Sequence, residues 1–310
     1  MEVIRTSNSI LEKVRLPIGK GEPFSFEVKR DDLIHSVISG NKWRKLKYNI
    51  LQVEHRKNQG VLTFGGPYSN HLIATAKATN IAGLKSIGIV RGDELNNESN
   101  ATLRHCAELG MQLVFISRSE YRSKDEPAYL KNLHSQYPNF FIVPEGGRNY
   151  YGVIGCQEIL TETNNDYDHV YLAGGTGTTG AGLLLGSKPN TKIHVVSALK
   201  GDFLRNETKQ LLYLVLNDSE MVELYMDRLL VHNDSHFGGY AKVPLELTDY
   251  INSVYHRSAL KLDPIYTSKA FYKMEEDYNS GLILNGEKVI FIHTGGLQGA
   301  EPWSSKIDFL

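Results

Sequence analysis

The residues His169–Gly180 read HVYLAGGTGTTG, and this stretch decides the fold class. It begins with a short apolar run, His169–Leu172, continues through glycines and threonines, and ends in residues with helical spacing. A buried strand that turns through glycines into a helix is typical of a βαβ unit, in which a helix connects two parallel strands. The stretch therefore predicts a parallel sheet.

The same succession of strand, turn and helix recurs along the chain and predicts an α/β fold. The predicted strands are Phe24–Val28, Val61–Phe64, Ser86–Val90, Gln112–Ile116, Phe140–Val143, His169–Leu172, Lys192–Ser197 and Lys288–Ile292. The predicted helices are Trp43–Arg56, Asn70–Asn80, Ala101–Leu109, Val153–Glu162, Gly180–Gly186, Glu207–Leu216 and Leu245–His256. Glycine pairs follow several strands, and because open α/β sheets bind ligands at the carboxyl ends of their strands, we expect these turns to form one site.

The chain of 310 residues is long enough for about two domains. Residues 48–144 contain four of the predicted strands, and we expect them to form a smaller α/β domain inserted into a larger one. The larger domain is expected to comprise residues 1–47 and 145–310. No repeat or proline-rich linker separates the two, so short connections must cross the boundary.

The composition excludes several classes of protein. The chain has 34 Lys and Arg against 35 Asp and Glu, and these scattered charges do not form the basic patch that nucleic-acid binding requires. There is no run of about 18 apolar residues and no apolar leader, so we expect no membrane span and a cytoplasmic location. Cys106 and Cys156 lack the spacing of a zinc site, and they are expected to be buried thiols. His232 and His236 fall in an expected loop, and no metal site is predicted.

The glycines and threonines at 174–180 are the strongest local signal of a ligand site. Backbone N–H groups and the dipole of the following helix favour a phosphate there, and the hydroxyls add donors. Gly175, Gly177 and Gly180 also have the spacing of a dinucleotide fingerprint, so an NAD-dependent oxidoreductase is an alternative. That alternative expects an acidic residue at the end of the next strand, where Ser197 stands instead. A turn that only lets the helix pack closely is the structural alternative.

Lys42 lies in the segment SGNKWRKL at 39–46, directly after a turn-prone Gly-Asn pair and before a predicted helix. Burial and neighbouring positive charge lower the pKa of a lysine ammonium and leave more free amine to attack a carbonyl. Taken alone, the segment fits a solvated helix face better. Together with a phosphate loop, it indicates a lysine that forms a Schiff base.

Polar residues in two further regions are candidates for the same site. Ser69 and Asn70 occupy capping positions before a predicted helix, whose N-terminus also favours a substrate carboxylate. Tyr240 follows Phe-Gly-Gly, and Tyr266 follows Leu-Asp-Pro-Ile. Among 17 tyrosines, either one taken alone is more often a packing residue than a catalytic one.

Taken together, these segments resemble the 1-aminocyclopropane-1-carboxylate deaminase and D-cysteine desulfhydrase family of pyridoxal-phosphate enzymes. The matching segments lie at 40–46, 68–71, 174–179, 263–267 and 293–296, in the family's order and over nearly the whole chain. The resemblance implies the fold-type II architecture of the tryptophan synthase β chain, with two open, twisted, mostly parallel sheets flanked by helices. It also implies a homodimer that acts on a small amino acid.

The resemblance assigns roles to individual residues. Lys42 would bind pyridoxal 5'-phosphate covalently and then move substrate protons. The other cofactor-binding residues would be Lys45, Asn70, Thr176, Gly177, Thr178, Thr179 and Thr294. The substrate carboxylate would be bound by Ser69, Asn70 and His71. The catalytic residues beside Lys42 would be Ser69, Tyr240 and Tyr266, and the phenols of the two tyrosines could act as acid or base.

Two positions bear on the substrate. In the deaminases the tyrosine matching Tyr266 is followed by a glutamate that bonds the pyridine nitrogen, whereas Thr267 follows here. Thr294 looks like the desulfhydrase members, in which a hydroxyl meets that nitrogen. A hydroxyl leaves the pyridine largely unprotonated, which suffices when a thiolate leaves from Cβ. We therefore expect elimination from a D-cysteine-like amino acid to pyruvate, ammonia and hydrogen sulfide. Opening of 1-aminocyclopropane-1-carboxylate to 2-oxobutanoate and ammonia is the alternative, and a binding module without turnover is a more remote one.

Overall fold

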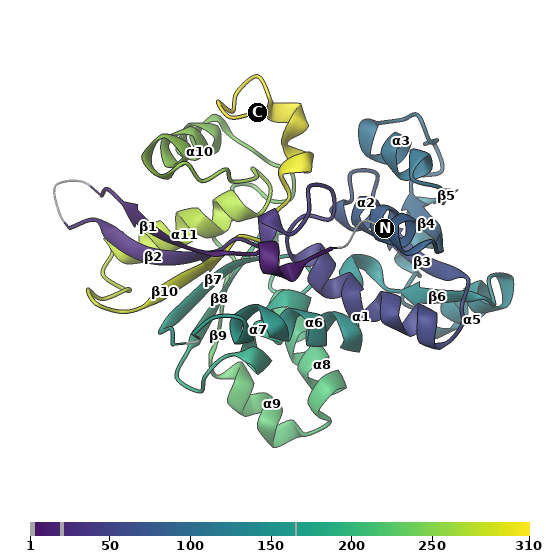
Figure 1. Cartoon of the computed structure of the whole chain (residues 1–310), viewed down its shortest axis with the longest axis horizontal. Helices are drawn as coiled ribbons and strands as arrows, with labels where there is room; N and C mark the ends of the chain where they lie inside the picture. Colours follow the sequence, from purple (N-terminus) through teal and green to yellow (C-terminus); the bar gives the residue numbers. More distant parts are fainter. Residues whose placement is uncertain (1–3, 19–21, 165) are drawn as a thin grey trace.

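The computed structural model describes residues 4–18, 22–164 and 166–310, which form two sheets toward opposite ends of the long axis (Figure 1). The 6-stranded sheet contains, in spatial order, β1 (Leu11–Leu16), β2 (Phe24–Lys29), β10 (Val289–Ile292), β7 (His169–Gly174), β8 (Lys192–Ser197) and β9 (Leu229–His232). The 4-stranded sheet contains β5 (Met111–Ile116), β4 (Lys85–Arg91), β3 (Gly60–Gly65) and β6 (Phe140–Val143). The β1–β2 pair is antiparallel and the other described pairs are parallel. The predicted fold class is confirmed.

Helices connect the strands and cover both sheets. The α-helices are α1 (Asn41–His55), α2 (Asn70–Ala82), α3 (Ala101–Glu108), α4 (Arg118–Arg122), α5 (Pro127–Gln136), α6 (Tyr150–Thr161), α7 (Thr178–Gly186), α8 (Leu204–Leu216), α9 (Ser219–Met226), α10 (Leu245–Ser258) and α11 (Thr267–Asn279). Short 3₁₀ helices occur at η1 (Thr6–Asn8), η2 (Asp31–Leu33), η3 (Glu145–Gly147) and η4 (Leu297–Trp303). None of the helices described here combines the length and apolar composition that a membrane crossing requires.

The central strands β10, β7 and β8 of the larger sheet are buried on both faces, so neighbouring residues of β7 enter different cores. Val170 and Leu172 pack with side chains of α6, α7, α8 and α9. Tyr171 and Ala173 pack with α10 and α11, which lie on the opposite face (Figure 1). This double burial explains why the strand reads as a continuous apolar run in the sequence.

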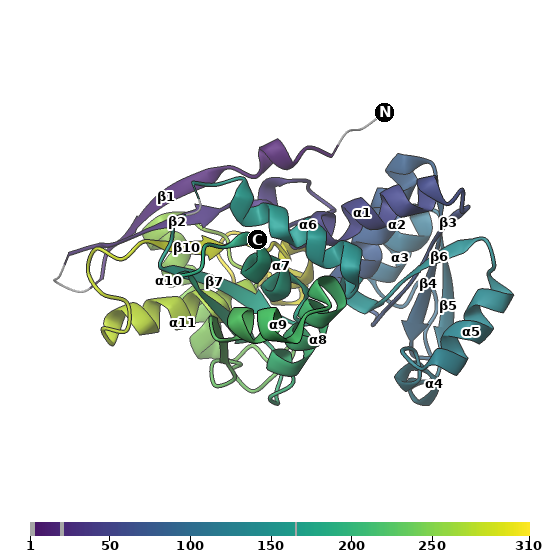
Figure 2. The ribbon, with the colours of Figure 1, turned by 90° about the horizontal axis from the view of Figure 1, so that it is seen from below.

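The smaller sheet is also covered on both faces (Figure 2). Leu62 and Phe64 of β3 pack with Tyr121 of α4 and Leu133 of α5. Helices α2 and α3 pack on the other face through a separate cluster. The sheet is built from residues 60–143, while the domain boundaries at 48 and 144 stay a prediction.

The carboxyl ends of three strands lead into the expected glycine turns. β7 ends at Gly174 before the loop that opens α7, and β3 ends at Gly65 before the turn that opens α2. β10 ends at Ile292, and His293 N then donates to Lys29 O at 3.0 Å. These turns, together with the start of α1, carry the candidate site.

Candidate active site

Lys42 lies in the first turn of α1, whose backbone packs directly against the turn that follows β10. Gly40 caps the helix with φ +66°, and a Cβ at this position would lie 1.7 Å from Thr294 O. Asn41 N donates to the same carbonyl at 3.3 Å. Only glycine fits at position 40, and the close approach holds Lys42 beside the 294–296 turn.

The amide of Asn41 joins Lys42 to the glycine-threonine loop. Asn41 Nδ2 donates to Thr179 Oγ1 at 2.9 Å, and Lys42 Nζ donates to Asn41 Oδ1 at 2.7 Å. Asn41 is buried, so both ends of its amide depend on these partners. The structure thus brings Lys42 and the loop together, as the sequence predicted.

The pKa of Lys42 is lowered from its ordinary value of 10.5 to about 7, because burial penalises the ammonium and the charge of Lys45 adds to this effect. Near neutral pH a far larger share of Lys42 is therefore free amine than for an ordinary lysine. A free amine in this position can attack a carbonyl carbon.

The loop before α7 presents donors that the described chain does not satisfy. Gly177 caps the helix with φ +74° and no side chain, and Ala181 is the first residue whose N–H finds a carbonyl, Gly177 O at 2.9 Å. No acceptor among the described residues takes the N–H groups of Thr178 and Thr179, which are buried. The hydroxyls of Thr176 and Thr178 lie 3.0 Å apart. Such a helix end fits an anion.

Lys45 places a positive charge beside this loop. Its side chain is buried, and no carboxylate of the described chain lies within ion-pair distance of it. A Cβ at Gly147 would lie 2.9 Å from Lys45 Cβ, and one at Gly146 would lie 2.9 Å from Thr176 Cγ2, so the η3 turn packs on both. A buried, uncompensated ammonium beside unsatisfied N–H groups fits a phosphate group.

Ser69 and His71 open α2 on the other side of the site. Ser69 Oγ accepts from His71 N at 3.2 Å and from Leu72 N at 3.3 Å, which leaves its own hydrogen available to a carboxylate. His71 Nε2 lies 2.9 Å from Thr63 Oγ1, whose hydrogen goes to Val143 O. Burial, with the charges of Lys42 and Lys45, lowers the pKa of His71 to about 3. The imidazole is therefore neutral and is bonded to β3.

Asn70, also at the start of α2, lies beside the turn after β10, which contains Thr294. A Cβ at Gly296 would lie 3.2 Å from Asp263 Cγ and 3.5 Å from Asn70 Nδ2, which places Asn70 beside the turn after β10. Thr294 is buried, and its hydroxyl makes no hydrogen bond within the described chain. Its free hydroxyl is thus a candidate partner for a ligand.

Thr267 has no such freedom. Its Oγ1 donates to Asp263 Oδ2 at 2.6 Å and accepts from Asp263 N at 2.8 Å. Asp263 also accepts from the backbone N–H groups of Ile265 and Tyr266, so it caps the start of α11. Thr267 therefore supports the helix start and has no hydrogen left for a ligand.

Tyr240 and Tyr266 come together near the loop. Their ring centroids lie 6.1 Å apart in an edge-to-face arrangement. A Cβ at Gly175 would lie 3.6 Å from Tyr266 Cε1. Burial raises the pKa of both phenols, so both carry their protons at neutral pH. They are placed to donate hydrogen bonds or protons.

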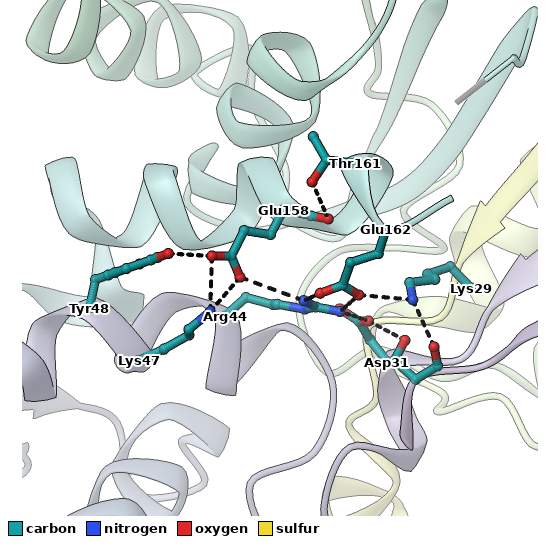
Figure 3. A network of polar contacts seen from close by, with 9 residues as sticks. Lys29, Asp31, Arg44, Lys47, Tyr48, Glu158, Thr161 and Glu162 are labelled. Atoms are coloured by element: carbon teal, nitrogen blue, oxygen red, sulfur yellow. Dashed lines mark hydrogen bonds and ion pairs between the residues drawn. The ribbon is translucent and has the colours of Figure 1, made fainter. Parts of the chain in front are cut away.

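A buried ionic network supports α1 (Figure 3) and was not found from the sequence. Arg44 is fully buried, and its Nη2 donates to Asp31 Oδ1 at 2.9 Å and to Glu162 Oε2 at 2.8 Å. Lys29 Nζ lies 3.0 Å from Glu162 Oε2, so β2, η2, α1 and α6 meet at this point. Arg44 is two residues from Lys42, and the network fixes the first turn that carries it.

A row of histidines crosses β7, β8 and β9 outside the site. His169 Nδ1 lies 2.9 Å from His194 Nε2, and His194 Nδ1 lies 3.0 Å from His232 Nε2. The rings of His194 and His232 are within 4° of parallel, and these two imidazoles and the Asp277 carboxylate each offer a ligand atom within 4.8 Å of the others. His232 ends β9, so its expected position in a loop with His236 is wrong.

Comparisons with known proteins agree with this geometry. The family model described as pyridoxal-phosphate dependent enzyme matches residues 14–295. The chain belongs to this family. A relative from Pyrococcus horikoshii, provisionally named a 1-aminocyclopropane-1-carboxylate deaminase, is 32% identical over 292 residues, which cover 90% of this chain and 87% of that protein. A mitochondrial protein of Arabidopsis thaliana, named bifunctional D-cysteine desulfhydrase/1-aminocyclopropane-1-carboxylate deaminase, is 30% identical and covers 88% of this chain and 72% of its own length.

Solved structures support the same membership. A 1-aminocyclopropane-1-carboxylate deaminase homologue superposes with a TM-score of 0.77 at 25% identity, and covers 96% of this chain and 92% of its own. A hydrogen sulfide-producing enzyme from Fusobacterium nucleatum shares the fold, with a TM-score of 0.66 at 17% identity and 93% coverage of both chains. The chain is thus a pyridoxal-phosphate-dependent enzyme of the deaminase and desulfhydrase family. The unsatisfied donors before α7 and the Lys45 ammonium fit the phosphate of this cofactor, and the Lys42 amine fits its carbonyl.

Proposed function

We propose that the enzyme eliminates hydrogen sulfide from a D-cysteine-like amino acid. The observation that carries this proposal is the difference between two threonines. Thr267, which follows Tyr266, has its hydroxyl committed to Asp263, whereas Thr294 is a buried residue, 6% exposed, whose hydroxyl makes no hydrogen bond within the described chain and is not itself fully buried. This difference supports the proposal that the Thr294 hydroxyl, and not a carboxylate after Tyr266, would meet the pyridine nitrogen.

When bound, pyridoxal phosphate supplies an electron sink that makes the Cα proton of an attached amino acid removable. A hydroxyl beside the pyridine nitrogen gives a weaker sink than a carboxylate does. The weaker sink favours a substrate whose own leaving group carries away an electron pair, and a thiolate does so more readily than a carbon of a cyclopropane ring.

The residues of this chain divide the remaining work. Lys42 and Asn70, with the α7 loop, would hold the cofactor, and Ser69 would donate its free hydrogen to the substrate carboxylate. The Lys42 amine would accept the Cα proton at Nζ. A phenol of Tyr240 or Tyr266 would donate a proton to the sulfur as the Cβ–S bond breaks. The product enamine then takes up water and yields pyruvate and ammonia, which balances the reaction.

The test is a side-by-side assay of sulfide and 2-oxo-acid release from D-cysteine, L-cysteine and 1-aminocyclopropane-1-carboxylate, with Lys42→Ala as the control. We expect equal amounts of sulfide and pyruvate from D-cysteine and none from the variant. Dominant release of 2-oxobutanoate from the cyclopropane would overturn the argument from Thr294 and establish the deaminase alternative, which is the activity that the names of several relatives state.

We also propose a homodimer, on the likeness to the family alone, and a location in the cytoplasm, as the sequence predicts. Light scattering on the purified protein checks the first part, since a dimer has twice the chain mass of 34.8 kDa.

A further inference from the structure

Lys269 is a buried lysine that neither the family motifs nor the proposed reaction uses. Its side chain is 1% exposed, and no carboxylate of the described chain lies within ion-pair distance of it. Nζ donates instead to two backbone carbonyls, His236 O at 2.8 Å and Gly239 O at 2.9 Å. Burying an ammonium without a counter-ion is unfavourable, and these two hydrogen bonds are what offsets it.

Both carbonyls belong to a segment of two successive tight turns, residues 236–242. Gly239 N donates to His236 O at 3.0 Å, and Lys242 N donates to Gly239 O at 3.2 Å. Phe237 and Ala241 adopt φ values of +50° and +54°. These are left-handed backbone conformations that residues other than glycine avoid, so the surrounding structure must impose them.

Tyr240 lies in the second of these turns, so the position of its side chain depends on the backbone conformation of both turns. It directly follows Gly239, one of the two residues bonded to Lys269, and its ring meets that of Tyr266 at 6.1 Å. Tyr266 is the residue before α11, and Lys269 lies in the first turn of that helix. One ammonium therefore links the segment that carries the first tyrosine to the helix that begins at the second.

We propose that Lys269 is a positioning residue that holds the Tyr240 phenol against Tyr266, because its ammonium donates hydrogen bonds to a carbonyl in each of the two turns of residues 236–242. The proposal rests on the function proposed above, because it assumes that the two tyrosines act in the reaction. It assigns Lys269 no contact with the substrate or the cofactor.

The test combines hydrogen exchange with a double-mutant cycle, and both are measured on the cofactor-loaded enzyme. In Lys269→Met, we expect amide exchange in residues 236–242 to become at least about tenfold faster, since two charge-assisted hydrogen bonds are lost. In Lys269→Met we expect kcat to fall at least about tenfold while KM changes little. In the double variant Lys269→Met/Tyr240→Phe, we expect kcat to be no lower than in Tyr240→Phe alone. Lys273→Met, on the same helix but paired with Glu276 and Asp277, is the matched control and should leave both readouts unchanged.

The outcomes separate this proposal from the reaction proposed above. The kinetic cycle uses whichever substrate the side-by-side assay shows to be turned over, so failure with D-cysteine overturns only the choice of substrate. Unchanged exchange in residues 236–242, or an effect of Lys269→Met that adds in full to that of Tyr240→Phe, would overturn the positioning role. If Lys269→Met does not fold, Lys269→Gln takes its place in the same cycle, since its amide retains a donor but no charge.

Discussion

Asn41 donates from Nδ2 to Thr179 Oγ1 at 2.9 Å, and this bond ties the first helix of the chain to the loop that opens α7. The two residues are separated by 138 positions in the sequence. Because the other end of the same amide accepts from Lys42, the position of the Lys42 amine depends on the position of the start of α7.

Replacing Asn41 with alanine should therefore weaken both cofactor retention and stability. The change leaves Thr179 and Lys42 without their partner, and we expect a loss of about 1–3 kcal/mol in the free energy of unfolding. Urea unfolding and equilibrium dialysis of the cofactor measure the two effects. Asn80→Ala is the matched control, because it removes an exposed hydrogen bond that the side-chain amide of Asn80 donates to Leu109 O. For this variant we expect a loss below about 1 kcal/mol in the free energy of unfolding. Equal losses in the two variants would contradict the prediction.

Gly40→Ala should be far more damaging than Gly83→Ala, although the two glycines have φ values of +66° and +68°. At Gly83 a Cβ meets nothing within 4 Å, so only the backbone strain of about 1–2 kcal/mol is expected. At Gly40 the Cβ would lie 1.7 Å from Thr294 O, and the start of α1 must move. We expect a loss above about 4 kcal/mol in the free energy of unfolding, measured in urea. If the two variants lose the same free energy of unfolding, the contact between residue 40 and Thr294 O tolerates a side chain.

The rate of cofactor attachment to the apoprotein should follow the titration of Lys42. Burial and the charge of Lys45 lower the pKa of this lysine to about 7, and the free amine is the reactive form. The rate should therefore rise with pH, with a midpoint near this pKa, and then level off, whereas an ordinary lysine would still gain free amine toward pH 10. Stopped-flow absorbance measures the rate, and Lys42→Ala is the control without attachment. Lys45→Met should move the midpoint to higher pH, because a positive neighbour has been removed.

Arg44→Met should destabilise the protein strongly. The change leaves the buried carboxylate of Asp31 without its cation, and we expect a loss of about 3–5 kcal/mol in the free energy of unfolding. Arg104→Met breaks an exposed pair with Glu98 and should cost less than about 1 kcal/mol. Chemical denaturation of both variants gives the comparison. A loss below about 1 kcal/mol in Arg44→Met would show that Asp31 finds another partner or takes up a proton.

The predicted strands were found where the chain is buried on both faces, as at His169–Leu172, because double burial leaves a local apolar run. β1 was not predicted, since it reads LEKVRL: its three charged residues, Glu12, Lys13 and Arg15, interrupt the apolar run, as is common in an edge strand with one wet face. α11 was not predicted either. Its start is capped by Asp263, several residues before the helix, and not by the residue at the cap position, Tyr266.

The site was predicted where its groups lie in short motifs, as for Lys42 and the α7 loop. The Arg44 network could not be found in this way, since its partners Asp31 and Glu162 lie 13 and 118 residues away in the sequence. The bond of Lys269 to His236 likewise spans 33 residues and has no local pattern. The tertiary fold alone brings such groups together.

β10 has a consequence for how the protein is made. It pairs with β2 on one side and with β7 on the other, yet it comprises residues 289–292 of a chain of 310. On the ribosome, the β1–β2 hairpin must wait for the synthesis of β10 before it can join β7, and β2 and β7 each keep an open edge until then. The close contact between Gly40 and the Thr294 carbonyl forms later still, since Thr294 follows β10. A chain that ends before β10 and Thr294 therefore has no properly placed Lys42.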